Sequence, residues 1–330
     1  MAQRVGTRAR SEPATPELLP FRLPDFTRIS WTSERARAVW EPRIAQITKA
    51  WLEIEWRGVV AGVRACAVRP ALADELVSEA PRWANAGLSF LPLALEAFGG
   101  SYSTVSESPS PDGPFRIRVV IGALEDVVAF KQAWDDADQH AIGSLLGYPS
   151  CCREFFHDVW VRQGMVDPTW PMAAASTNVE NGARLIEIDG PPQANILWRW
   201  MGVRAMSHLP CSCDCAPTLA LADRMLAVGR EAGFEQEMDW ALEILSWPLE
   251  WSALHGIAVI KTPVLKVTTM TDATPHAYVV RWAGTRFPRE GARGLEFPYR
   301  LSRRPLSSSR AFKRGLEAAG TVPEGLTNGS

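Results

Sequence analysis

Apolar side chains recur at helical spacing in the first part of the chain, three to five residues apart, as on one face of an α-helix. The positions on this face are Ile44, Ile47, Trp51, Ile54 and Val59. This pattern predicts a helix over residues 33–69, ended by Pro70. A second helix is expected over residues 71–98, before two consecutive glycines.

Later segments mix helical and alternating patterns. Residues 101–113 are rich in Ser and Pro and are expected to form a loop. Further helices are expected at 124–146, 150–163, 193–206, 216–229 and 235–245. Strands are expected at 115–121, 185–188, 257–260, 264–268 and 278–282. These elements predict an α+β fold that is mainly helical, with a small, mostly C-terminal β-sheet.

The two ends of the chain differ from its centre. Residues 1–28 contain regularly spaced prolines, and residues 301–330 are basic and rich in Ser and Gly. Such composition is typical of disordered tails. Between them, we expect an N-terminal helical region at 29–100 and a cysteine-containing α+β domain at 114–300.

The composition limits which partners and which cellular compartment can be expected. The formal net charge of −2 gives no electrostatic reason to expect nucleic acid as a partner. The sequence shows neither an apolar signal segment nor an apolar run of membrane-spanning length, so a cytoplasmic protein is expected, with no membrane contact. Thiols stay reduced in the cytoplasm, which favours metal ligation or redox chemistry over structural disulfides.

The cysteines carry the clearest chemical signal. Five of the six fall into two short groups. Their members are Cys151 and Cys152 in the first group, and Cys211, Cys213 and Cys215 in the second. Each group is expected where a loop enters a helix, and a helix N-terminus favours the thiolate form that binds metal. We therefore predict one site that joins both groups.

The spacing of the cysteines leaves the metal open. Structural zinc sites usually pair two C-x₂₋₄-C turns, and adjacent cysteines seldom reach one tetrahedral ion. Adjacent thiolates can reach different irons of a cluster, so the pattern favours an iron–sulfur cluster of the 4Fe-4S type, with zinc as the alternative. The expected ligands are Cys151, Cys152, Cys211 and Cys215.

Two turns carry a resemblance. The segments Gly147 to Cys152 and Pro210 to Cys215 resemble an uncharacterised prokaryotic protein family marked by Gly-Tyr-Pro-x-Cys-Cys and Pro-Cys-Ser-x-x-Cys. The resemblance covers about the last two-thirds of the chain. It implies no activity or substrate.

Residues near the second cysteine group are candidates for proton transfer and thiol chemistry. His208 and Asp214 are candidate acid–base groups, and Cys213 is a candidate spare or reactive thiol. A loop histidine bonded to the backbone is an equal interpretation of His208.

The expected helix at 193–206 carries Asn195, Arg199 and Arg204, which are candidates to bind an anionic substrate. A solvated arginine face is the alternative. The resulting hypothesis is an iron–sulfur enzyme acting on a small anionic molecule, by Lewis-acid, sulfur-transfer or redox chemistry, with an electron donor as a possible partner. A zinc-stabilised binding or scaffold protein and a thiol–disulfide redox protein are the rivals.

Overall fold

The computed structural model describes residues 27–97, 114–164, 167, 169–176, 183–271, 278–290 and 295–296. The predicted loop at 101–113 and tail at 301–330 lie outside these residues, as does the predicted tail at 1–28 except for its last two residues. Those two residues, Thr27 and Arg28, are part of a β-strand.

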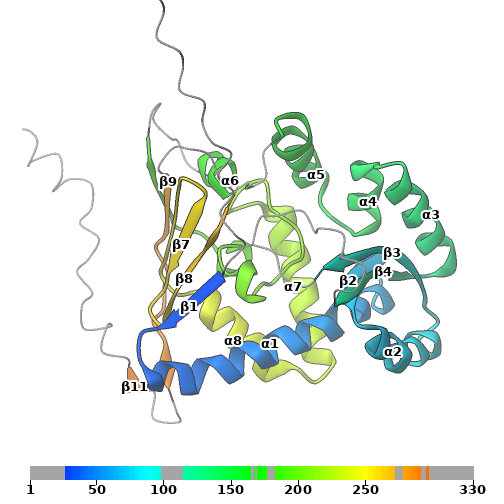
Figure 1. Cartoon of the computed structure of the whole chain (residues 1–330), viewed down its shortest axis with the longest axis horizontal. Coiled ribbons are helices and arrows are strands. Elements are labelled where there is room, and N and C mark those ends of the chain that lie inside the picture. Colours follow the sequence, from blue (N-terminus) through cyan, green and yellow to red (C-terminus); the bar gives the residue numbers. More distant parts are fainter. Residues whose placement is uncertain are drawn as a thin grey trace, which may run out of the picture.

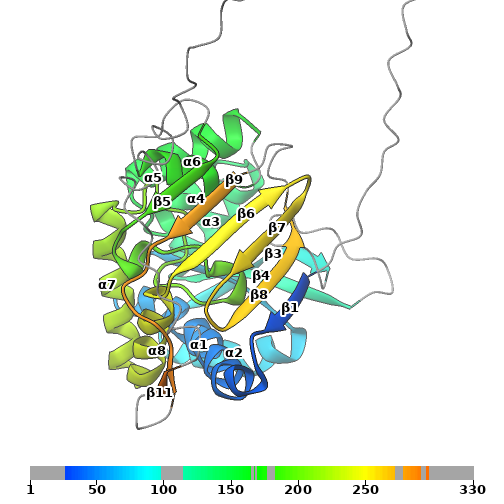
Figure 2. The same ribbon diagram turned by 90° about the vertical axis from the view of Figure 1, so that its left-hand side faces the viewer.

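The larger sheet has six strands in the order β1-β8-β7-β6-β9-β5. Neighbouring strands are antiparallel except β5 and β9, which are parallel. Figure 2 looks onto this sheet, with the helices behind it. Its strands are β1 (Thr27–Trp31), β5 (Leu185–Ile188), β6 (Leu249–Leu254), β7 (Ile257–Lys261), β8 (Leu265–Met270) and β9 (Tyr278–Trp282).

The smaller sheet has three antiparallel strands in the order β2-β4-β3. Both edge strands contain a proline, Pro70 in β2 and Pro92 in β3, and the central strand contains none. This placement is expected because proline lacks the backbone N–H that a central strand needs for hydrogen bonds to the strands on both sides. The strands are β2 (Cys66–Ala71), β3 (Ser89–Ala97) and β4 (Phe115–Gly122), and a separate two-stranded ribbon pairs β10 (Arg289–Glu290) with β11 (Leu295–Glu296).

Helices cover the inner face of the larger sheet and both faces of the smaller one (Figure 1). The α-helices are α1 (Glu34–Val60), α2 (Ala73–Asn85), α3 (Leu124–Asp135), α4 (Gln139–Leu145), α5 (Ser150–Phe156), α6 (Thr169–Ala175), α7 (Ala216–Glu231) and α8 (Glu235–Leu245). No helix among the described residues is long and apolar enough to cross a membrane.

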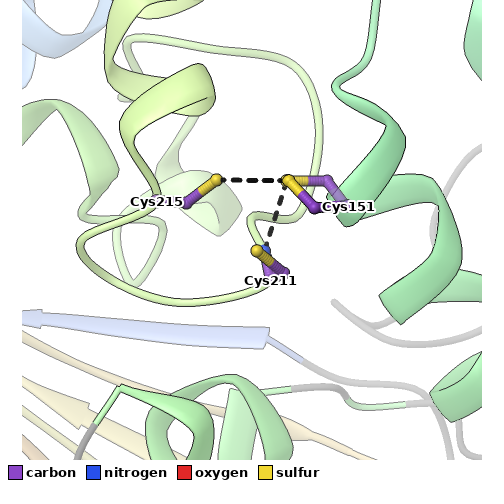
Figure 3. Close-up of side chains that lie close together, drawn as sticks. Cys151, Cys211 and Cys215 are labelled. Carbon is purple, nitrogen blue, oxygen red and sulfur yellow. Dashed lines mark hydrogen bonds between the residues drawn. The ribbon is translucent and has the colours of Figure 1, made fainter.

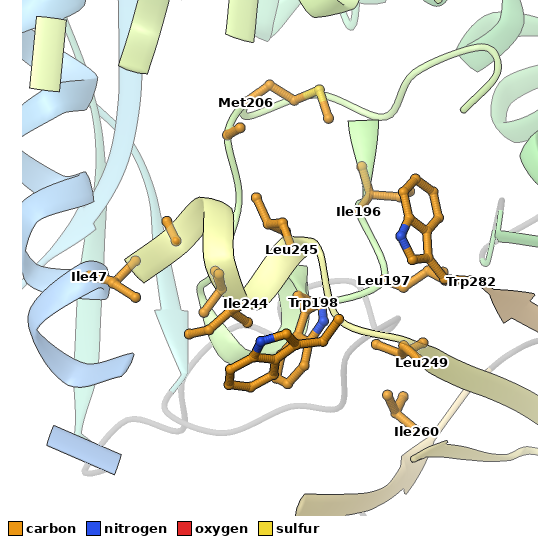
Figure 4. Close-up of a cluster of buried hydrophobic side chains, with 14 of the residues drawn as sticks. Ile47, Ile196, Leu197, Trp198, Met206, Ile244, Leu245, Leu249, Ile260 and Trp282 are labelled. Carbon is orange, nitrogen blue, oxygen red and sulfur yellow. The ribbon is translucent and has the colours of Figure 1, made fainter. Parts of the chain in front are cut away.

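The main core lies between the larger sheet and helices α1, α7 and α8. Alternate strand residues point into it; Ala258 and Ile260 of β7 are fully buried. Figure 4 shows core side chains from α1, from α8 and from the strands. At its centre Trp247 makes edge contacts with Trp40 and Trp198, with ring centroids 4.5 and 5.8 Å apart.

The predicted fold class is wrong in the extent and placement of its strands. The prediction was a mainly helical chain with a small, mostly C-terminal sheet. Instead, two sheets take strands from Thr27 to Trp282, and β2 and β3 occupy segments predicted to be helical. Residues 89–97 are rich in Leu and Ala, which favour helices. Pairing with β4 overrides that preference, because β4 needs a partner on each side.

Two predicted helices are also wrong. Residues 193–206 form only two short 3₁₀ turns, η2 (Pro192–Ala194) and η3 (Arg199–Met201). Gly202 stops the second turn with a φ of 75°. The helix predicted over 124–146 is divided into α3 and α4 at Ala137, which has a φ of 54°. Both breaks use backbone conformations that a periodicity argument does not detect.

Candidate metal centre

The thiols of Cys151, Cys152, Cys211 and Cys215 form one cluster, with their sulfur atoms all within 4.8 Å of one another. The Sγ–Sγ distance is 3.9 Å for Cys151–Cys152, 3.7 Å for Cys151–Cys215 and 3.6 Å for Cys152–Cys215. Figure 3 shows thiols from α5 and from the loop before α7 turned toward one another. The predicted meeting of the two cysteine groups is confirmed, and this thiol cluster could hold a metal ion.

The Gly-Tyr-Pro turn sets the position of the first two thiols. Gly147 ends α4 with a φ of 72°, and Tyr148 N–H donates to the carbonyl of Gly143 over 2.9 Å, as in a Schellman cap. A Cβ at Gly147 would lie 2.9 Å from the Cβ of Arg64, so only glycine fits without displacement. Pro149 is the N-cap residue of α5, and its carbonyl accepts hydrogen bonds from the N–H groups of Cys152 and Arg153, so both cysteines lie in the first turn.

The second group reaches the cluster from the start of α7. Cys215 is the N-cap residue of α7, and Pro217 lies in the first turn. The N–H of Cys211 points to the Cys152 sulfur over 3.4 Å. The hydroxyl of Thr218 lies 3.3 Å from the same sulfur. These donors suit a thiolate at Cys152.

Charge within the cluster is costly without a cation. Burial and the nearby thiols raise the pKa of Cys152 well above its usual value and raise that of Cys211 to about 12. Burial also acts against the Cys215 thiolate, but hydrogen bonds from Thr218 and from the thiols of Cys211 and Cys152 together outweigh it and lower the pKa of Cys215. A bound divalent ion would offset half of the charge of four thiolates and so favour the deprotonated form of each.

Cys213 and Asp214 lie outside the cluster. Cys213 is buried in the main core, its N–H donates to the Ser176 hydroxyl over 2.7 Å, and burial raises its thiol pKa to about 11. Asp214 is exposed and accepts a hydrogen bond from Ser212 over 2.6 Å. Their predicted catalytic roles stay predictions.

His208 is linked to the thiol cluster by the side chain of Thr218. Its Nε2 is 2.8 Å from the Thr218 hydroxyl, which also contacts Cys152. Its ring is tilted by 34° against that of Tyr148, with centroids 5.0 Å apart. Burial lowers the pKa of His208 to about 4, so the imidazole is neutral at pH 7. Within the described residues, its buried Nδ1 has no hydrogen-bond partner.

The three predicted substrate-binding residues are placed differently from one another. Asn195 is buried and uses its amide internally, donating to Leu245 over 2.8 Å and accepting from Leu197 over 3.1 Å. It does not share a helical face with Arg199, because residues 193–206 form no continuous helix. Arg199 and Arg204 both line one cavity of about 350 Å³.

Two cavities share the segment that leads into the second cysteine group. Ser207, His208 and Leu209 line both the cavity with the two arginines and a second one of about 240 Å³. Cys152 and Tyr148 line the second cavity. The segment 207–209 is therefore a wall between the two cavities, and it lies two residues before a thiol of the cluster.

A buried ionic network, which the sequence argument missed, holds this wall. The Glu55 carboxylate accepts hydrogen bonds from Trp51 over 2.7 Å and from Ser207 over 2.6 Å, and it forms ion pairs with Arg64 and Arg204. Burial opposes the charge, but the arginines and Ser207 outweigh it and lower the pKa of Glu55. The sequence did contain a signal for this network, because Glu55 is a charged residue beside Trp51 and Ile54 on the apolar face of the predicted helix.

The chain matches no protein-family model, no curated protein and no solved structure. The function of the protein is therefore inferred from the chemistry and geometry of the site itself.

Proposed function

We propose that the protein binds one zinc ion through the four thiolates of the thiol cluster. The observation that carries this proposal is the spacing of the sulfur atoms. A tetrahedral ion with Zn–S bonds of about 2.3 Å places its sulfurs about 3.8 Å apart. The three Sγ–Sγ distances of 3.6, 3.7 and 3.9 Å match this value.

The same distances weigh against the 4Fe-4S cluster favoured by the sequence. In a cluster, the cysteine thiolates bind different irons and stand farther apart than around a single ion. Zinc was the less favoured prediction because adjacent residues such as Cys151 and Cys152 seldom reach one tetrahedral ion. Their sulfur atoms are 3.9 Å apart and both lie close to Cys215, which supports binding to a single ion.

A site with four thiolate ligands is closed, and closed zinc sites stabilise structure. This one would join the start of α5 to the loop before α7. The ion would thereby fix the wall at 207–209 between the two cavities. We therefore propose a zinc-stabilised protein that binds a small molecule beside its metal centre.

The test is metal and sulfide analysis of protein purified without oxygen. We expect one zinc per chain, no acid-labile sulfide, and cobalt–thiolate charge-transfer bands after exchange with Co²⁺. Iron with sulfide in equal amounts would replace this proposal with the iron–sulfur enzyme. No bound metal together with reversible disulfide formation would replace it with the thiol redox protein.

Two serine variants provide a matched pair. Cys211→Ser removes a proposed ligand, and Cys213→Ser changes a thiol two residues away that lies outside the cluster. We expect Cys211→Ser to lower zinc affinity and Cys213→Ser to keep the zinc. Equal zinc loss in both variants would contradict the assignment of ligands.

A further inference from the structure

We propose that the cavity lined by Arg199 and Arg204 binds a small organic molecule through an oxyanion group, either a carboxylate or a phosphate. The cavity has a volume of about 350 Å³, within the range of small-molecule sites. This proposal does not depend on which metal the thiol cluster holds. It goes beyond the zinc proposal by naming the chemistry of the ligand.

Arg199 is held in place by its surroundings. Its guanidinium donates to the carbonyl of Ile196 and to the hydroxyl of Thr169, each over 3.1 Å. Asp167 lies 3.7 Å away and balances its charge. A fixed guanidinium loses little freedom when it binds an anion, so it is a preorganised donor.

Arg204 supplies the excess positive charge. Its Nη2 lies 3.3 Å from Glu55, but Glu55 is already paired with the buried Arg64. One carboxylate thus faces two guanidiniums, and this group carries a formal charge of +1. The Arg204 guanidinium also lies 5.7 Å from the ring centre of Trp51, which fixes its direction.

The other cavity walls offer neutral groups. Ser207 and Thr27 add hydroxyls, and Trp200 and Met206 add apolar surface. An oxyanion attached to a short, partly apolar body fits such walls: the guanidiniums bind the charged end. A site lined by charge alone would suit a free inorganic ion better.

The experiment is isothermal titration of the metal-loaded protein with inorganic phosphate, phenyl phosphate, succinate and benzoate at constant ionic strength. We expect saturable binding of at least one of the three organic anions, with higher affinity than that of inorganic phosphate. Phenyl phosphate binding without benzoate or succinate binding assigns a phosphate group, and the reverse assigns a carboxylate. No saturable binding of any of the four probes would overturn the proposal.

Arg204→Gln tests the site directly, with Arg224→Gln as the matched control. Arg224 lies outside the cavity and donates to the carbonyl of Gly62 over 3.0 Å. We expect at least a tenfold loss of affinity in Arg204→Gln, unchanged affinity in Arg224→Gln, and unchanged metal content in both. Undiminished binding in Arg204→Gln would overturn the proposal, because Arg204 would then serve only its ion pair with Glu55.

A second measurement uses the unaltered protein, in case Arg204→Gln does not fold. Phenylglyoxal modifies accessible arginines, and mass spectrometry locates the modified residues. The bound anion should protect Arg204 from modification and leave Arg224 equally reactive. Equal modification of Arg204 with and without a saturating anion would contradict the proposed site.

Discussion

Loss of the buried Glu55 carboxylate should strongly destabilise the protein, and Glu55→Gln tests this expectation. The side chains of Glu55 and Arg64 are only 4% and 3% exposed, so both charges are removed from water. The amide of glutamine would leave the charges of Arg64 and Arg204 without a counter-ion. Removing one partner of a buried ion pair costs about 3–5 kcal/mol.

The matched control is Glu53→Gln on the same helix. Glu53 pairs with Arg82, whose side chain is 42% exposed, and with Arg57. An ion pair that is open to water contributes about 0–1 kcal/mol. We therefore expect Glu55→Gln to lose at least about 2 kcal/mol more than Glu53→Gln, given these two ranges.

The assay is urea unfolding of metal-loaded protein, with the free energy of unfolding extrapolated to water. Equal losses in the two variants, or a loss below about 1 kcal/mol in Glu55→Gln, would refute the reasoning from burial. A double variant, Glu55→Leu with Arg64→Met, gives a further check. It should be more stable than Glu55→Gln, because it leaves fewer buried charges without a partner.

Three further predictions concern the turn before the thiols, the buried imidazole and the core. Gly147→Ala should destabilise the metal-loaded protein more than Gly87→Ala in thermal unfolding. Both glycines have positive φ. A Cβ at Gly147 would press on Arg64, whereas no described atom lies within 4 Å of a Cβ at Gly87. Equal losses would show that the contact is easily relieved. His208 has a folded-state pKa of about 4, below its unfolded value, so the fold favours the neutral form. Its contribution is complete above about pH 6.5 and falls as the pH drops toward 4, by about 2 kcal/mol between pH 7.5 and 5. His208→Gln should therefore show a shallower loss of stability in urea unfolding over this interval, and an unchanged slope would contradict the burial argument. Trp40→Ala should cost about 3–5 kcal/mol in the same assay, since its ring is fully buried against another tryptophan; a loss below about 1 kcal/mol would mean that the site collapses around the smaller side chain.

Periodicity predicted the fold best where one face of an element is buried. The apolar face of α1 begins after Ser33, whose hydroxyl caps the helix over 3.0 Å, and the start of this helix was predicted. Local preference failed at β3, because the neighbouring strand that pairs with it lies beyond a predicted loop. The pairing of β1 with β8 joins residues more than 230 positions apart, and no short window of sequence contains that signal.

The candidate site divides in the same way. The four proposed ligands were predicted because cysteine is rare and its chemistry is specific. Asn195 was misplaced because the helix assumed for it does not form. Glu55 comes from a segment far from the cysteine motifs, so only the folded arrangement brings it to the wall. Thr218 follows Cys215 by three residues, but its contact with Cys152 likewise depends on the fold. Motifs predicted the ligands, while the groups that support them depend on tertiary contacts.

X-ray absorption spectroscopy of the purified metal-loaded protein tests the central claim most directly. We predict an absorption edge of zinc and a single shell of four sulfur atoms at about 2.3 Å, with no neighbouring metal atom. An iron edge with a metal–metal scattering distance would contradict the account. It would show that the four thiolates bind different irons of a cluster and not a single zinc ion.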